Sequence, residues 1–191
     1  METKNIMIVG VGGQGSLLAS KLLGHLLMSQ GYDVKVSEVH GMSQRGGSVV
    51  TYVRYGDKVF SPVIDKGEAD YIVSFEILEA ARWLPFLKKD GQIVTNTQQI
   101  DPMPVITGAA EYPENILEEL RAKYSVYSIN AMEKAEELGN TRVFNTIVLG
   151  MAARHMNYTK EQWIDVIKAK VPPKTVDINL AGFEVGYNSV D

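Results

Sequence analysis

Short apolar runs and segments of helical spacing alternate along the first two thirds of the chain. Residues 5–9 form an apolar run typical of a buried strand in a parallel sheet. Residues 16–30 then repeat leucines at helical spacing, with Leu18, Leu22 and Leu26 on one face, and Gly31 follows as a helix-ending residue. Valines alternate over residues 33–39 and predict a second strand. The pattern therefore begins as strand, helix, strand.

The middle of the chain continues this alternation around one interruption. Residues 48–55 and 58–63 are rich in strand-forming residues around Gly56–Asp57, which predicts an inserted β-hairpin. Further strands are predicted at residues 71–75, 92–97, 105–106 and 126–129. Helices are predicted at residues 77–89, which Pro85 should kink or break into two turns, and at residues 113–124.

The last third of the chain has helical periodicity throughout. Helices are predicted at residues 131–138, 143–156 and 176–187, and another is expected to begin after Thr159, a typical N-cap residue. The whole pattern predicts one domain over residues 1–191. Its fold class is a three-layer α/β/α Rossmann-like domain with a mixed, mostly parallel sheet, the inserted β-hairpin and a helical C-terminal third.

A glycine-rich turn joins the first predicted strand to the first helix. It contains Gly10, Gly12, Gly13, Gln14 and Gly15. The G-x-G-x-x-G spacing is that of dinucleotide-binding folds, in which free backbone amides at a helix N-terminus bind phosphate. Glu38 lies roughly 20 residues further on, at the end of the second strand, where such folds place a ribose-binding acid. The alternative is a turn whose glycines allow another chain to pack closely.

A second polar loop follows the second predicted strand. Its residues are His40, Gly41, Met42, Ser43, Gln44, Arg45, Gly46 and Gly47. Ligands of open α/β sheets bind at the carboxyl ends of the strands, and an arginine there can hold a carboxylate or a phosphate. The alternative is an ordinary glycine-rich surface loop that leads into the hairpin.

The remaining chemistry of the chain is sparse. Glu76 ends the third parallel strand and Glu79 follows at helical spacing, so these carboxylates either face solvent, cap the helix or line a site. The three histidines lack metal-ligand spacing, and no serine stands in a nucleophile elbow. We therefore assign no catalytic residue and no metal ligand to this chain.

Composition narrows the possible functions. With 45% hydrophobic and 22% charged residues the chain is typical of a globular protein, and a formal charge of -4 gives no reason to expect nucleic acid. No apolar run reaches the roughly 18 residues of a membrane helix and the first residues are polar, so we expect a cytoplasmic protein without membrane contact. The chain has no cysteine, which excludes disulfides and thiolate-bound iron–sulfur clusters on it.

Both polar loops together resemble a known family. The string from Gly10 to Gly15 and the string from Glu38 to Val49 are similar to the gamma-type module of 2-oxoacid:ferredoxin oxidoreductases, within the branch that acts on indolepyruvate. Residues 67–70, Glu76, Gly139–Asn140 and the segment that begins at Asn145 agree with this resemblance. It extends over nearly the whole chain and adds Asn145 to the candidate substrate or interface residues.

The resemblance implies an enzyme assembled from two kinds of subunit. It implies oxidative decarboxylation of aryl pyruvates, with coenzyme A as co-substrate and ferredoxin as electron acceptor. Thiamine diphosphate and the [4Fe-4S] clusters are then expected on a large alpha subunit, and no tightly bound cofactor is expected on this chain. The two loops would face that partner and coenzyme A, and Glu38 need not hold a ribose. The alternatives are an NAD(P)-binding Rossmann-type oxidoreductase and a nucleotide-binding module.

Overall fold

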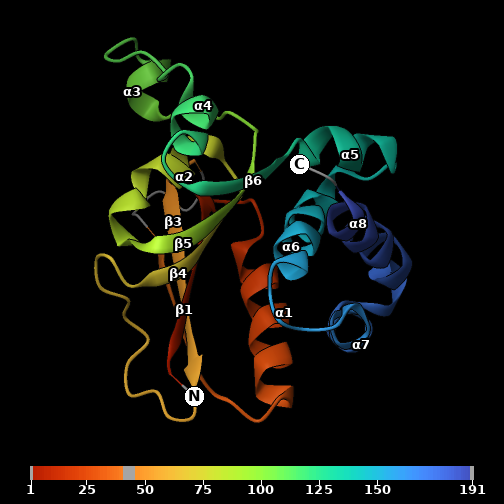
Figure 1. Cartoon of the computed structure of the whole chain (residues 1–191). Helices are drawn as coiled ribbons and strands as arrows, with labels where there is room; N and C mark the ends of the chain where they lie inside the picture. Colours follow the sequence, from red (N-terminus) through yellow and green to blue (C-terminus); the bar gives the residue numbers. More distant parts are fainter. Residues whose placement is uncertain (1, 41–45, 190–191) are drawn as a thin grey trace.

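A six-stranded sheet forms the centre of the computed structural model, which describes residues 2–40 and 46–189 (Figure 1). The strands lie in the order β2-β3-β1-β4-β5-β6. Their bounds are β1 (Lys4–Val11), β2 (Asp33–His40), β3 (Ser48–Gly56), β4 (Ala69–Ser74), β5 (Leu87–Asn96) and β6 (Ser125–Ile129). β3 pairs antiparallel with β2 and β1, and the other pairs are parallel. The sheet is therefore mixed and mostly parallel, as predicted.

Helices cover both faces of the sheet. The helices are α1 (Ser16–Ser29), α2 (Ile77–Arg82), α3 (Met103–Ile106), α4 (Ile116–Arg121), α5 (Ala131–Glu137), α6 (Phe144–Arg154), α7 (Lys160–Lys170) and α8 (Val176–Asn188). Short 3-10 turns are η1 (Leu84–Phe86), η2 (Thr141–Val143) and η3 (Pro173–Thr175). No helix in the described ranges 2–40 and 46–189 has the length and apolar character needed to cross a membrane.

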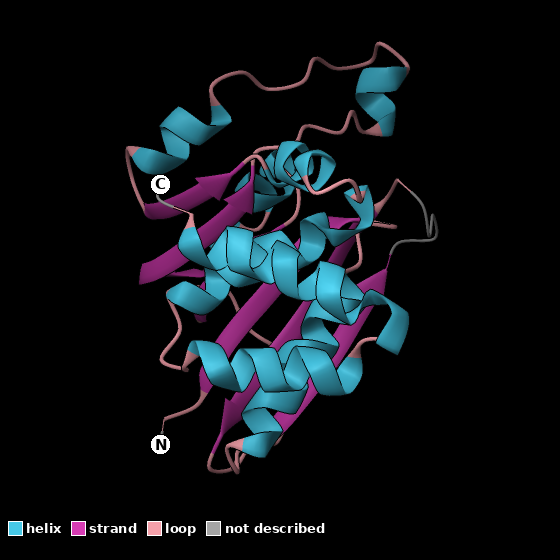
Figure 2. Ribbon diagram, turned by 90° about the vertical axis from the view of Figure 1, so that its right-hand side faces the viewer, coloured by secondary structure: helices cyan, strands magenta, loops and turns pink. Residues whose placement is uncertain are grey.

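Two hydrophobic cores separate because neighbouring side chains of a strand point to opposite faces. Ile6 and Ile8 of β1 pack with α1, α6, α7 and α8, whereas Met7 and Val9 pack with α2 and α4. Figure 2 views the first of these faces, with its helices in front of the strands. The continuous apolar run of β1 is explained by burial on both sides, and the three-layer prediction is confirmed.

The predicted hairpin is only half correct. β3 forms, but its partners are β2 and β1, and the described residues 58–63 form no strand. Because β1 occupies the second edge of β3, the returning segment has no ladder to join. Arg54 instead holds this segment through hydrogen bonds from Nη1 to the carbonyl oxygens of Ser61 (3.1 Å) and Val63 (2.7 Å).

Predictions between residues 77 and 116 also need correction. The helix predicted to reach residue 89 ends at Arg82, and a 3-10 turn containing Pro85 leads directly into β5. Proline lacks the N–H group that a continuing helix needs. Residues 105–106 belong to the short helix α3 rather than to a strand, and α4 begins at Ile116 rather than near residue 113.

The helical last third agrees with its sequence pattern. Thr159 caps α7 in a capping box with Gln162, so the predicted N-cap is confirmed. α6 and α8 cross at two glycines: a Cβ on Gly186 would lie 1.8 Å from the carbonyl oxygen of Ile147, and one on Gly150 would lie 2.1 Å from that of Phe183. The two backbones can therefore approach this closely only without side chains.

Candidate functional site

The glycine turn and the second loop meet at the carboxyl edge of the sheet. The amide of Gly12 donates a hydrogen bond of 2.8 Å to the carbonyl oxygen of Gly47. Residues 41–45 of the second loop, and with them Gly41, Met42, Ser43, Gln44 and Arg45, lie outside the described residues. His40, Gly46 and Gly47 are described, and His40 Nε2 lies 3.1 Å from an oxygen of Glu38.

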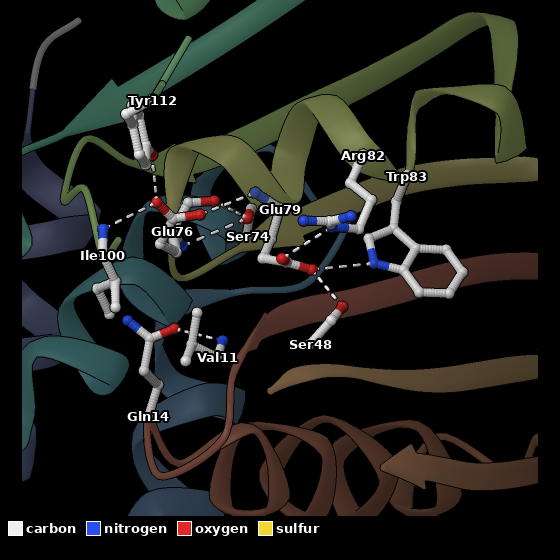
Figure 3. Close-up of polar contacts among 10 residues, drawn as sticks. All are labelled: Val11, Gln14, Ser48, Ser74, Glu76, Glu79, Arg82, Trp83, Ile100 and Tyr112. Atoms are coloured by element: carbon white, nitrogen blue, oxygen red, sulfur yellow. Dashed lines mark hydrogen bonds and ion pairs between the residues drawn. The ribbon is translucent and has the colours of Figure 1, made fainter. Parts of the chain in front are cut away.

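Gln14 fills the glycine turn from within (Figure 3). Its Oε1 accepts a hydrogen bond of 2.8 Å from the Val11 amide, and its Nε2 donates to the carbonyl oxygen of Phe75 at 3.0 Å. A Cβ on Gly10 would lie 2.8 Å from Gln14 Oε1. Gly10 is therefore required by the chain's own glutamine, and the buried Gln14 ties β1 to β4.

Asn145 approaches the same turn from α6. Gly15 has a positive φ of 88°, and a Cβ there would lie 2.2 Å from Asn145 Nδ2. The Asn145 side chain is buried and its Oδ1 accepts a hydrogen bond of 3.2 Å from Thr146 Oγ1. The turn is thus packed against Asn145, which places two of the predicted site residues in direct contact.

Glu38 is committed to neighbouring side chains. One oxygen accepts hydrogen bonds from Ser16 Oγ at 3.2 Å and from Thr51 Oγ1 at 3.0 Å, and the other lies beside His40. A ribose-binding carboxylate needs free acceptor positions for two hydroxyl groups. The geometry of Glu38 therefore does not favour the nicotinamide alternative.

Glu76 is the buried centre of the site, with 1% of its surface exposed. It N-caps α2 by accepting a hydrogen bond of 2.8 Å from the Glu79 amide. Its other oxygen accepts from the Ile100 amide at 3.1 Å and from the hydroxyl of Tyr112. Burial raises the pKa of the Glu76 carboxyl above its ordinary value, against these hydrogen bonds, and burial with the Glu76 contact raises the pKa of Tyr112.

Glu79 is also buried, so the possibility that these carboxylates face solvent is excluded. It accepts hydrogen bonds from Arg82 Nε at 3.0 Å, from Trp83 Nε1 at 3.3 Å and from the Ser48 hydroxyl (Figure 3). Ser48 begins β3, directly after the second loop. Glu79 therefore fixes the start of β3 to α2, next to the meeting point of the two loops.

A cleft of about 450 Å³ opens beside these carboxylates. Its walls come from the end of β1, the start of β3, α2 and α3, and its lining includes Val11, Gly46, Gly47, Ser48, Glu76, Leu78, Glu79, Arg82, residues 100–104 and Ile106. Met103 and Ile106 are 64% and 65% exposed on its outer wall. The cleft offers backbone groups and apolar surface, together with the carboxylates of Glu76, Glu79 and Asp101 and one arginine that is paired with Glu79. Such a lining suits the binding of a chain or an elongated ligand.

The site offers no centre for metal chemistry in the part of the chain that the structure describes. No group of three or more histidine, cysteine or acidic side chains there could hold a metal ion. The whole sequence lacks cysteine and therefore cannot ligate an iron–sulfur cluster through thiolates. A reaction that needs such a cluster therefore needs ligands from outside these 191 residues.

Sequence reasoning did not find Tyr112, Gln98 or Ser48. Tyr112 lies in a coil segment before α4, and Gln98 Oε1 accepts a hydrogen bond of 3.2 Å from Gln14 across 84 positions of the sequence. No local pattern marks such contacts, because they depend on how β4 and β5 align. A tyrosine within a polar loop was the sole available signal.

Comparison with known proteins gives consistent matches along the chain. The family described as "Pyruvate ferredoxin/flavodoxin oxidoreductase" matches residues 5–189. "Indolepyruvate oxidoreductase subunit IorB" of Thermococcus kodakarensis is 43% identical over 197 residues, which covers 99% of this chain and 96% of that protein. The protein of the same name from Archaeoglobus fulgidus is 41% identical, and the alignment covers 96% of this chain and 94% of that protein.

Solved structures share the fold at lower identity. Pyruvate oxidoreductase subunit PORC from Thermotoga maritima superposes with a TM-score of 0.75 at 22% identity. The match covers 100% of this chain and 98% of the Thermotoga chain. The 2-oxoglutarate:ferredoxin oxidoreductase from Magnetococcus marinus, solved with 2-oxoglutarate, coenzyme A and succinyl-CoA, gives 0.74 at 19% identity. This match covers 98% of the present chain but 31% of the Magnetococcus chain, so the same fold also occurs within a longer polypeptide.

Proposed function

This chain belongs to the pyruvate ferredoxin/flavodoxin oxidoreductase family, and we propose that it is the small subunit of an enzyme that acts on aryl pyruvates. One observation carries the choice of substrate. The relatives at 41–43% identity are named as indolepyruvate oxidoreductase subunits and match over nearly their full length. Pyruvate synthase subunit PorC of Methanocaldococcus jannaschii is 26% identical.

The proposed reaction joins an aryl pyruvate to coenzyme A. The bond between the two carbonyl carbons breaks, carbon dioxide leaves, and the acyl carbon forms a thioester with the coenzyme A sulfur. Two electrons pass to two ferredoxins and one proton is released, which yields arylacetyl-CoA. Thiamine diphosphate would stabilise the carbanion and [4Fe-4S] clusters would carry the electrons. We assign both to a partner subunit, because this chain has no cysteine that could bind a cluster.

The cleft at the carboxyl edge is the surface that we assign to the large alpha subunit and to coenzyme A. Its apolar outer wall, formed by Met103 and Ile106, is exposed in the single chain. Its carboxylates, Glu76 and Glu79, already accept internal hydrogen bonds and hold α2 and β3 in place. We therefore assign them positioning roles, and the reacting groups to the partner.

The test is reconstitution with a large alpha subunit from the same organism. The isolated chain should lack iron and should not oxidise any 2-oxoacid. The assembled enzyme should reduce ferredoxin with coenzyme A present, faster with indolepyruvate, phenylpyruvate or 4-hydroxyphenylpyruvate than with pyruvate or 2-oxoglutarate. Activity of the isolated chain would overturn the subunit role, and a preference for pyruvate would overturn the aryl specificity.

A further inference from the structure

A second cavity, of about 640 Å³, lies at the opposite edge of the sheet from the cleft. It is bounded by the first residues of β1, β4 and β5, by the end of β3, and by the loop between α6 and α7. Figure 1 shows that this edge, near the N-terminus, is separated from the α3 end of the molecule by the length of the strands. A ligand here would not touch the carboxyl-edge cleft.

Tyrosines form one wall of this cavity. Tyr32 and Tyr55 pack with ring centroids 5.4 Å apart at 57°, and the hydroxyl of Tyr158 lies beside both. Tyr71 completes the wall and donates a hydrogen bond of 2.9 Å to the carbonyl oxygen of His155. Such a wall suits a flat aromatic ring, which gains from edge-to-face and offset contacts with tyrosine.

Lysines gather on the rim. Lys4 and Lys88 share a single oxygen of Asp70, at 3.2 and 2.9 Å, while the other oxygen of Asp70 accepts from the Asn5 amide at 2.8 Å. With Lys89, three lysines oppose the two carboxylates of Asp70 and Asp90 in the lining, which leaves one excess positive charge. The rim can therefore accept one more anionic group.

The lining of the cavity also includes a buried amide oxygen. Gln92 lines the cavity, and its Oε1 is buried without a hydrogen-bond partner in the part of the chain that the structure describes. A buried acceptor without a partner destabilises the folded state. Rotation about the Cγ–Cδ bond would exchange the positions of Oε1 and Nε2 without breaking a hydrogen bond of the oxygen. A ligand that donates an N–H group would satisfy it.

From these three features we propose that the cavity binds a small aromatic carboxylate with a ring N–H group. The ring would pack on the tyrosines, the carboxylate would lie among the lysines, and the N–H group would donate to Gln92. This site is independent of the proposed function, since it shares no residue with the carboxyl-edge cleft. Its volume lies within the range of small-molecule sites.

The test is calorimetric titration of the full chain near pH 7 with indole-3-acetate and two matched analogues. Indole-3-acetate should bind one to one with a dissociation constant below about 1 mM. 3-Methylindole lacks the carboxylate and 1-methylindole-3-acetate lacks the N–H group, so each should bind at least about tenfold more weakly. No saturable binding of indole-3-acetate at several millimolar would overturn the proposal.

Variants locate the bound ligand. The double variant Lys88→Met and Lys89→Ala should weaken binding about tenfold or more and leave the Asp70–Lys4 pair in place. Lys174→Ala on η3 removes the same type of charge outside the cavity and should leave the affinity unchanged. Arg82→Met in the cleft is the second control. Loss of binding in either control, or full binding in the double variant with an unchanged melting temperature, would overturn the assignment.

Discussion

The Glu76 carboxyl joins three segments of the chain through hydrogen bonds. It accepts hydrogen bonds from the start of α2, from the segment after β5 and from Tyr112 before α4. It is nevertheless buried, and burial disfavours its charged form. The residue therefore holds three segments together while its own ionisation costs stability.

Replacing Glu76 with glutamine should change the dependence of stability on pH. Because the pKa of the folded state lies above the ordinary value of 4.5, the native protein keeps a proton that the unfolded chain releases. The contribution of Glu76 to the unfolding free energy should therefore fall as pH rises from about 4.5 through the folded pKa. Glu76→Gln should remove this fall and destabilise the protein at low pH by about 1–2 kcal/mol, because Nε2 cannot accept from the Glu79 amide.

Urea unfolding of both proteins between pH 4 and 8 measures this effect. The unfolding free energy of the wild type should exceed that of Glu76→Gln at low pH, and this difference should shrink as pH rises. An advantage that grows with pH would mean that the hydrogen bonds outweigh burial and that the native carboxylate prefers its charge. Glu68→Gln, on a carboxylate before β4 whose side chain lies outside this cluster, is the control and should leave the profile unchanged.

Arg45 lies outside the described residues, so its role stays a prediction from sequence. If it holds a carboxylate or phosphate of a substrate, Arg45→Ala should raise the KM of the assembled enzyme for the 2-oxoacid or coenzyme A about tenfold or more, through loss of a charge-assisted hydrogen bond. Steady-state kinetics of the reconstituted enzyme measure this, with Arg121→Ala as a matched charge control. Unchanged kinetics in an intact complex would contradict a role in substrate binding.

At the scale of elements, the entry into α1 depends on backbone shape more than on a ligand. Gly15→Ala should lower the unfolding free energy by about 2–4 kcal/mol, because the residue has a positive φ and its Cβ would meet Asn145. Gly13→Ala is the matched control: its φ is also positive, but a Cβ there meets nothing within 4 Å. It should cost only about 1–2 kcal/mol. Chemical denaturation measures both unfolding free energies. Equal losses in the two variants would show that the side chain of Asn145 can move away from a Cβ at position 15.

The crossing of α6 and α8 gives a second matched pair. Gly186→Ala should cost about 3 kcal/mol or more, because the new Cβ would overlap the backbone carbonyl of Ile147. Gly182→Ala, one turn earlier, would meet only side-chain atoms, of Val143 and Ile147, at 3.2–3.4 Å, and should cost less, about 1 kcal/mol. Thermal unfolding distinguishes them. A Gly186→Ala variant with a melting temperature close to that of the wild type would mean that the two helices can move apart without loss of the fold.

The elements that sequence predicted correctly are those whose signal is local. β1 is a pure apolar run, α1 has regular leucine spacing, and Thr159 with Gln162 forms a capping box. The incorrect elements were decided by distant partners. The segment at 58–63 lost its ladder because β1 already pairs with β3, which pattern alone cannot show.

In the candidate site, too, the local features could be predicted and the contacts between distant residues could not. The turn from Gly10 to Gly15 was predicted in position, but the ligand-binding interpretation could not anticipate that Gln14 and Asn145 occupy its space. Those contacts arise when β4 and α6 are brought to the turn by the fold. A glycine spacing therefore identifies a close approach, and the structure decides which atoms make it.

At the scale of the whole molecule, the face at the end of the sheet carries exposed apolar side chains beside the cleft. α3 presents Met103 and Ile106 to solvent beside the cleft, although apolar side chains of this size are normally covered in a stable assembly. Residues 102–110 form backbone hydrogen bonds of 2.8–3.1 Å among themselves, which define the shape of α3. We propose this surface as the contact for the large subunit.

The double variant Met103→Asp and Ile106→Asp should weaken assembly with the large subunit about a hundredfold, because two charges replace apolar contacts at an interface. The chain itself should keep its melting temperature, since both side chains are exposed when it is alone. Phe60→Asp is the matched control: Phe60 is 85% exposed in the segment before β4, away from the cleft. Sedimentation of reconstituted mixtures separates the outcomes. Equal loss of assembly in both variants would assign the interface to a wider surface, and unchanged assembly in the double variant would place the large subunit on another face.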